Sequence, residues 1–232
     1  MRNRLLALLA VLTVSLVGCS SQQAGPKPRP TATAIPSSFP LAAGTRDPTR
    51  AISVQRGVGI DPGFAPWIET SLRECGRHLT WVTSRTSVAA VSVPSTAQGV
   101  PPDQRTLAVF ATEPEAKAHL SAIAHLAPAC SGRPPRSPRA PGQIGLSGNA
   151  GVFLESEAGD ASYAWTTPDS TVLHLAVRIG RAILLERTTQ TTATPEQSIA
   201  AAELRLQPVL VAMCAYAEGS CRHRAQSTGS AS

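Results

Sequence analysis

The chain has 232 residues and a formal net charge of +6, and aromatic residues make up only 4% of it. This length suits one domain with a core of mainly aliphatic side chains, because aromatic side chains are scarce. The basic residues are scattered and form neither a basic helix nor a stripe interleaved with aromatic residues, which argues against a nucleic-acid-binding protein.

The N-terminus has the organisation of a bacterial lipoprotein signal peptide. Two arginines precede an apolar stretch at residues 5–16, and the small residue Gly18 stands directly before Cys19. This apolar stretch is too short to span a bilayer comfortably, so a retained transmembrane helix is disfavoured. We therefore predict that residues 1–18 are removed and that Cys19 is lipidated with palmitate-type acyl chains on the extracytoplasmic face of the cell membrane. A plain secretory signal is the alternative.

The segments on either side of the domain are predicted from composition. Residues 19–45 are rich in Pro, Ala, Ser and Thr without apolar periodicity, which predicts a lipidated cysteine followed by a disordered tether. Residues 46–222 are predicted to form a single domain. Residues 223–232 are predicted to be a disordered tail.

Three helices are expected within this domain. Residues 65–79 carry apolar side chains at helical spacing. A second helix is expected to begin after Thr112, with a glutamate three residues later as its capping partner, and to end at Pro128. A third is expected after Thr194, followed by a proline at the first helical position, and Pro208 should kink or split it.

Alternating apolar residues and turn signals predict a run of strands between the second and third helices and before them. The predicted strands are residues 88–93, 106–110, 151–157, 162–166, 172–179 and 181–189, with a hairpin at Gly180. Successive hairpins bounded by helices predict an α+β fold, an antiparallel sheet with helices packed mainly on one face.

The cysteines support an exported protein. Besides Cys19, the chain has Cys75, Cys130, Cys214 and Cys221, and an even number in an exported chain predicts two disulfides. Of the three possible connectivities we favour Cys75–Cys130, because both lie on the apolar stripes of predicted helices, and Cys214–Cys221, because they are close in sequence. A zinc site is not expected, since the chain has no C-x-x-C pair.

Two carboxylates deserve a test as catalytic groups. Glu155 and Glu157 share one face of a predicted strand, and paired carboxylates can hydrolyse glycosidic bonds. The simpler interpretation is the solvent-facing side of a half-buried strand. We therefore predict a protein without enzyme activity, cofactor or metal, with a cell-envelope hydrolase as an alternative.

The few aromatic residues are candidates for ligand binding. Trp67, Trp81 and Trp165, together with Tyr163, can line a groove for an apolar or glycan ligand. The alternative is that they anchor the core.

Several short stretches resemble a known family. They are Val109-Phe110, a helix from Ala116 to Cys130, a strand ending in Val177-Arg178-Ile179-Gly180, and an alanine-rich closing helix. From about Pro48 to Cys221 the chain resembles the PknH-like extracellular sensor domain, which occurs in actinobacteria outside receptor serine/threonine kinases and in stand-alone lipoproteins. The resemblance implies an α+β fold with disulfides and a cleft for a small ligand, and it brings no catalytic residues.

These observations predict a membrane-anchored extracytoplasmic lipoprotein with a non-catalytic ligand-binding or sensor-type domain. The expected partners are the membrane, through the lipid on Cys19, and a small-molecule, lipid or glycan ligand, but no nucleic acid. An accessory protein that docks on a membrane complex through an exposed apolar face is a further alternative.

Overall fold

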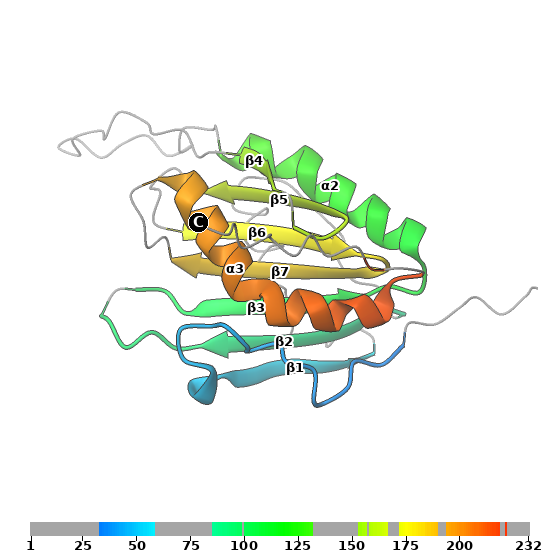
Figure 1. Ribbon diagram of the computed structural model, residues 1–232, viewed down its shortest axis with the longest axis horizontal. Helices are drawn as coiled ribbons and strands as arrows, with labels where there is room; N and C mark the ends of the chain where they lie inside the picture. The colour runs from blue at the N-terminus through cyan, green and yellow to red at the C-terminus, as the bar shows by residue number, and fades with distance from the viewer. Residues whose placement is uncertain are drawn as a thin grey trace, which may run out of the picture.

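A computed structural model describes the parts of the chain that carry the fold. They are residues 33–58, 85–98, 100–131, 153–156, 158–166, 172–189, 194–218 and 221. The described residues form one seven-stranded sheet in which each neighbouring pair of strands is antiparallel, with two α-helices packed on it (Figure 1). The α+β class and the antiparallel sheet are thus confirmed.

The sheet consists of two meanders that meet in its middle. Its order is β1-β2-β3-β7-β6-β5-β4, so that β3 pairs with β7 where the meanders join. The strands are β1 (Ile52–Val58), β2 (Ser87–Val93), β3 (Asp103–Val109), β4 (Phe153–Ser156), β5 (Ala161–Thr166), β6 (Val172–Ile179) and β7 (Ala182–Thr189). The predicted hairpin joins β6 to β7, and its Gly180 has a φ of 52°, a value that glycine adopts without strain. Strand β1 was not predicted, because it is an edge strand with an exposed and irregular pattern.

The two α-helices begin where their capping residues predict. In α2 (Glu113–Ser131) the hydroxyl of Thr112 accepts from the third backbone N–H after it at 3.4 Å, and in α3 (Pro195–Met213) Thr194 does the same at 3.3 Å. The expectation that Pro128 ends α2 is wrong, since the helix continues to Ser131. A proline this close to the end removes one backbone hydrogen bond and leaves the last turn intact. Helix α3 continues through Pro208, and its axis changes direction along its length (Figure 1), as the proline predicts.

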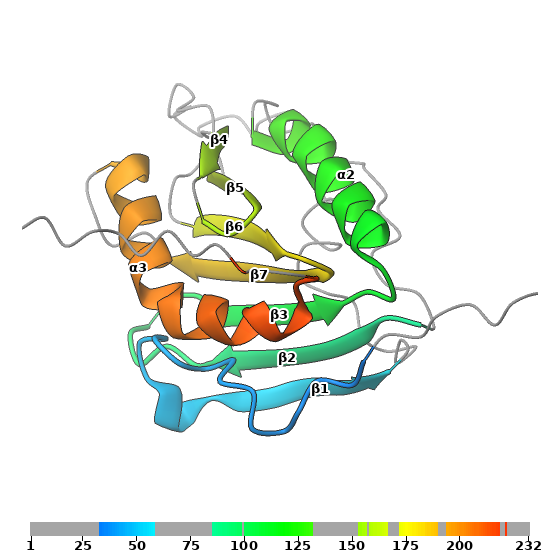
Figure 2. The same ribbon diagram turned by 45° about the vertical axis from the view of Figure 1, so that its right-hand side comes forward.

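The two helices lie on opposite faces of the sheet (Figure 2). Residues adjacent in a strand point to opposite sides, and they divide between two core clusters. The cluster under α3 contains Leu107, Val177, Leu184, Leu206 and Leu210, whereas the cluster under α2 contains Ala108, Leu120, Ile123, Ala176 and Ile183. The expectation that helices pack mainly on one face is therefore wrong for these two helices. The reason is that β6 is buried along its whole length, and a strand buried on both faces needs a cover on each.

The domain begins earlier than composition predicts. Residues 33–45, which we call the strap, lie on the α3 face, and Ile35 and Leu41 are buried in the cluster under α3. The backbone N–H of Ile35 donates to the Ser87 hydroxyl at 3.2 Å, and an arginine, Arg105, donates to the Leu41 carbonyl at 3.2 Å. The interpretation of residues 19–45 as a disordered tether is thus wrong from Thr33 onwards. Its few apolar residues, separated by proline and serine, carry no periodicity that reveals the packing.

Candidate functional site

The α2 face of the sheet brings two of the predicted aromatic residues together. Trp165 on β5 pairs with His174 on β6, and their rings stack with centroids 5.2 Å apart and an interplanar angle of 13°. Tyr163 lies two residues from Trp165 on the same face of the same strand. We call Tyr163, Trp165 and His174 the aromatic row.

A polar pair extends this row across the sheet. His174 is opposite Arg187 on β7, and Arg187 is opposite Gln104 on β3. The Arg187 guanidinium donates to the Gln104 side-chain oxygen at 3.3 Å, and both side chains are half-buried. The row therefore leads from aromatic rings to a cation within three neighbouring strands.

The residues of the aromatic row differ in how much of each side chain is exposed. Trp165 and His174 are 5% and 2% exposed, and Trp165 belongs to the cluster under α2. Tyr163 is half-buried and packs at the edge of that cluster. Trp165 thus anchors the core, whereas Tyr163 and Arg187 keep part of their surface exposed. Trp67 and Trp81 lie outside the described residues.

A second aromatic stack lies between α2 and the end of β3. The rings of Phe110 and His119 are stacked with centroids 4.6 Å apart. Burial lowers the pKa of His119, and the negative charge of Glu115 opposes that shift only in part. His119 is therefore neutral at neutral pH and acts there as an aromatic side chain.

An ion network closes one end of the α2 face. The Arg178 guanidinium donates to the Glu113 carboxylate and to the Gly180 carbonyl, each at 3.0 Å, and lies 3.3 Å from the Asp160 carboxylate. Asp160 also accepts from the backbone N–H of Gly180 at 2.7 Å. These contacts tie the first turn of α2 to the β6–β7 turn and hold the helix over the sheet.

A serine pair contacts a carboxylate on the opposite, α3 face. The Ser156 and Ser162 hydroxyls are 2.7 Å apart, and Ser156 donates to the Glu203 carboxylate of α3. A serine nucleophile of the triad type needs an imidazole between hydroxyl and carboxylate, and among the contacts of these three side chains in the described structure none is a histidine. We read this cluster as a link between β4 and α3.

Only one of the two candidate catalytic glutamates lies among the described residues. Glu155 lies in β4 opposite Tyr163, and Glu157 lies outside the described residues. Among the residues that the structure describes, no group of three or more His, Cys, Asp or Glu side chains is placed to hold a metal ion. The hydrolase alternative stays a prediction.

One predicted disulfide is present. Cys214 and Cys221 are bonded, with their Cα atoms 5.4 Å apart, and Cys221 packs against the cluster under α3. The bond holds the chain after α3 against the core. Cys130 lies in the last turn of α2, whereas Cys75 and Cys19 lie outside the described residues, so the second disulfide and the lipid anchor stay predictions.

Comparison of the chain with family models, curated proteins and solved structures finds no match. The sequence pattern also did not reveal His174 and Arg187 as parts of a site. Their alternation in β6 and β7 points them away from the α3 cluster, which is typical of solvent-facing residues. Only the pairing of β5 with β6 and of β6 with β7 makes them neighbours of the buried Trp165 ring.

Proposed function

We propose that this protein is a membrane-anchored extracytoplasmic lipoprotein whose domain binds a ligand without catalysis, in the manner of the PknH-like sensor domains that it resembles. The observation that carries the proposal is the aromatic row together with Arg187, which lies opposite His174 on the next strand. Tyr163 and Arg187 are both half-buried, and in this proposal they supply an aromatic ring and a cation with several donors. This combination suits a small molecule, lipid headgroup or glycan with one flat or apolar part and one anionic or hydroxyl-rich part.

Two features support the extracytoplasmic location. The sequence ending at Cys19 has the pattern of a lipoprotein signal, and the Cys214–Cys221 bond is of a kind that persists in oxidising compartments. A lipoprotein with more than one acyl chain is held stably on a membrane.

The anchor is tested by expressing the full chain and its Cys19→Ser variant in an actinobacterial host. We expect the unaltered protein in the membrane fraction, with an N-terminal peptide that begins at Cys19 and carries acyl chains by mass spectrometry. The variant should leave the membrane fraction or keep an uncleaved signal. An unmodified Cys19 in the mature protein would refute the anchor.

Ligand binding is tested by thermal shift with two probes, muramyl dipeptide and short-chain phosphatidylglycerol. We expect at least one probe to stabilise the protein, and Tyr163→Ala and Arg187→Gln to abolish that stabilisation. Lys117→Gln, an exposed position on α2, is the matched control and should keep it. No stabilisation by either probe, or stabilisation unchanged in the Tyr163 and Arg187 variants, contradicts a binding site at the aromatic row.

A further inference from the structure

The outer side of α3 presents an apolar stripe to solvent. The large side chains Leu204 and Val211 are 65% and 59% exposed, although both are aliphatic. They belong to a set of uncharged, exposed residues spaced three or four apart, which places them on one side of the helix. This set, which we call the α3 stripe, is Ala200, Leu204, Pro208 and Val211 in α3 and Ala215 in the 3-10 turn that follows it.

The strap extends this uncharged surface beside the helix. Residues 33–45 contain no charged residue, and Gly44 approaches the Arg205 carbonyl so closely that a Cβ atom on Gly44 would lie 2.0 Å from it. The ring of Phe39 in the strap lies 6.1 Å from the ring of Tyr216, which follows α3. The strap therefore lies beside α3 and extends its uncharged surface, although Thr33, Ser37 and Ser38 in the strap are exposed hydroxyl-bearing residues. We call the α3 stripe together with this strap surface the apolar face, after the aliphatic side chains of the α3 stripe.

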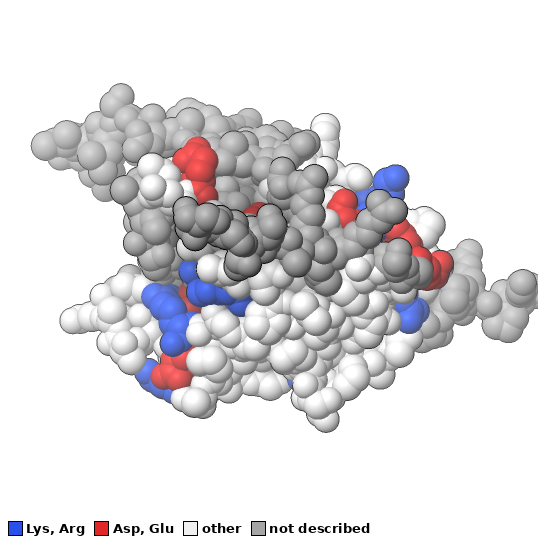
Figure 3. Space-filling model, viewed as in Figure 1, with Lys and Arg blue, Asp and Glu red and all other residues white. Residues whose placement is uncertain are grey.

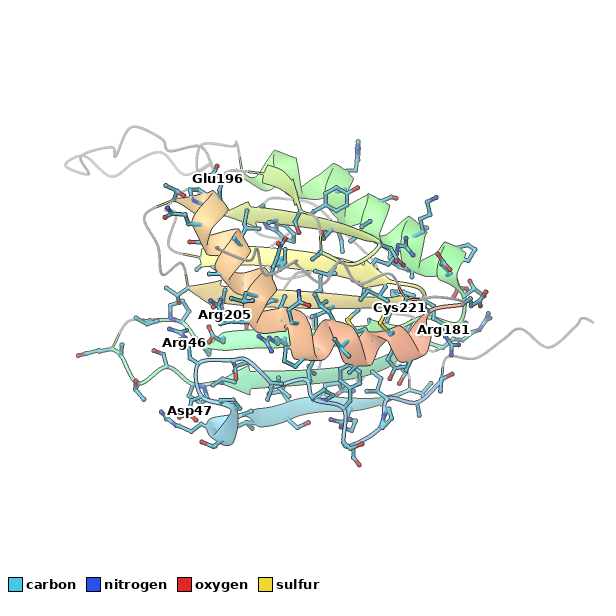
Figure 4. All side chains as sticks on the ribbon, viewed as in Figure 1. Arg46, Asp47, Arg181, Glu196, Arg205 and Cys221 are labelled. Atoms are coloured by element: carbon cyan, nitrogen blue, oxygen red, sulfur yellow. A yellow bond between two sulfur atoms is a disulfide. The ribbon has the colours of Figure 1, made fainter. Side chains whose placement is uncertain are left out.

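Charged residues stand at the borders of the apolar face. Figure 3 shows a broad white surface over the second half of α3 and the strap, with charged side chains at its edges. In Figure 4, Arg46, Asp47 and Arg205 lie at one end of this surface and Arg181 at the other. The exposed side of α2, on the far side of the sheet, differs in carrying Glu115 and Lys117.

Helix α3 can meet a membrane only along its outer side. The segment Pro195–Tyr216 is long and apolar enough to cross a bilayer by length and composition, with a mean hydropathy of 1.3. However, its inner residues Leu206 and Leu210 are buried in the domain core. A helix that spans the bilayer would have to leave that core, whereas a helix lying in the plane of the membrane interface uses its outer side alone.

The predicted anchor attaches to the same side of the domain. The Thr33 hydroxyl accepts from the Arg181 guanidinium at 2.6 Å, and the backbone N–H of Arg181 donates to the carbonyl of Tyr216 at 3.2 Å. The described chain thus enters the fold beside the end of α3. Cys19 is 14 residues before Thr33, which is at most about 50 Å of fully extended chain. A lipid on Cys19 therefore limits the distance between the bilayer and this end of the apolar face to about 50 Å.

We propose that the apolar face rests on the bilayer that holds the Cys19 anchor, with Leu204 and Val211 at the boundary between headgroups and acyl chains. The proposal rests on the lipid anchor of the proposed function. In this orientation the aromatic row lies on the opposite face of the sheet, away from the membrane.

The test uses the full-length, lipidated protein in vesicles of phosphatidylethanolamine and phosphatidylglycerol. A photo-crosslinking residue, p-benzoylphenylalanine, replaces Leu204 or Val211 in the apolar face, or Lys117 on α2 as the matched control. We expect crosslinks to lipid to be about tenfold more frequent from the apolar face than from the control. The reason is that a helix lying in the membrane interface inserts its apolar side between the lipids, whereas Lys117 on the far side of the sheet stays in water. Equal lipid crosslinking from both faces, or crosslinks from the apolar face mainly to protein, overturns the proposal.

A second measurement needs no substitution. Hydrogen exchange of the strap in the unaltered lipidated protein should be slower in vesicles than in detergent-free solution after enzymatic release of the domain from its lipid-bearing N-terminus. An unchanged rate overturns the docking. If mass spectrometry instead finds Cys19 without lipid, the proposed function itself fails, and that result is distinct from a lipidated protein whose apolar face does not touch lipid.

Discussion

Replacing Arg105 by methionine removes one half of a buried ion pair and is expected to destabilise the domain strongly. The side chains of Arg105 and Glu186 are 0% and 2% exposed. Nε and Nη2 of Arg105 donate to the same oxygen of Glu186 at 3.0 and 2.8 Å. Its Nη1 donates to two carbonyls of the strap, those of Leu41, at 3.2 Å, and Ala43. The guanidinium therefore neutralises a buried carboxylate and fastens the strap to the sheet.

The expected loss of stability in Arg105→Met follows from the groups that the substitution leaves buried without a partner. Removing one partner of a buried ion pair costs about 3–5 kcal/mol, because the remaining charge is buried without compensation. Each strap carbonyl that loses its donor adds about 1 kcal/mol. The sum is a large share of the roughly 5–15 kcal/mol that holds an ordinary domain folded. The double variant Arg105→Met/Glu186→Leu removes both charges and should regain about 2–4 kcal/mol relative to Arg105→Met alone.

Urea unfolding of the full chain, followed by circular dichroism, measures these free energies of unfolding, and hydrogen exchange reports on the strap. The strap should exchange faster in both the single and the double variant, since both lose the donor to its carbonyls. Lys117→Met, an exposed position, is the control and should change stability by less than about 0.5 kcal/mol. A loss below about 1 kcal/mol in Arg105→Met, or a double variant no more stable than the single one, would refute the reasoning.

Three further predictions concern the strap, a partly buried ion pair and the disulfide. Gly44→Ala should lower the free energy of unfolding by about 2–4 kcal/mol, because φ at Gly44 is 73° and the new Cβ would lie 2.0 Å from a carbonyl oxygen of α3. Gly57→Ala is the control and should cost less, because a Cβ at Gly57 would meet nothing within 4 Å. Equal costs for the two variants in thermal or urea unfolding would contradict the close approach of Gly44 to α3. Burial tends to raise the pKa of Asp103, but hydrogen bonds from Arg46 and a threonine hydroxyl and the Arg46 charge outweigh it, so its pKa is lowered. The stability that the Arg46–Asp103 pair contributes is present above about pH 4 and is lost as the pH falls through the lowered pKa of Asp103. Arg46→Gln should therefore move the midpoint of acid unfolding to higher pH. An unchanged midpoint would count against a stabilising role of the pair. Cys221→Ser should cost about 2.5 kcal/mol in unfolding without reductant, since its bond closes a short loop, and the cost should vanish when both proteins are measured with reductant.

Local signals predicted the elements well. Alternating apolar residues placed β6 and β7 within a residue of their observed bounds, and the capping residue Thr194 marked the start of α3. These features depend on a few neighbouring residues, so they can be predicted without a fold. The Cys214–Cys221 bond was predictable for the same reason, because its two residues are close in sequence.

Signals that depend on distant partners were misread or missed. His174 alternates with apolar residues as a solvent-facing residue does, yet it is buried and stacks on Trp165. Leu41 lies in a segment whose composition is typical of a tether, yet α3 and the buried Arg105 hold it in the core. In each case the decisive neighbour is more than 50 residues away in sequence or comes from another element.

The sequence by itself determined the local architecture of this protein: which segments are strands, where its helices begin, and which cysteines near the C-terminus pair. The tertiary structure alone decided which face of the sheet each helix covers. The central strands are apolar on both sides, so their sequence does not predict which helix packs on which side. That choice places the aromatic row under α2 and the apolar face on α3. It thereby separates the candidate ligand site from the surface that we propose rests on the membrane.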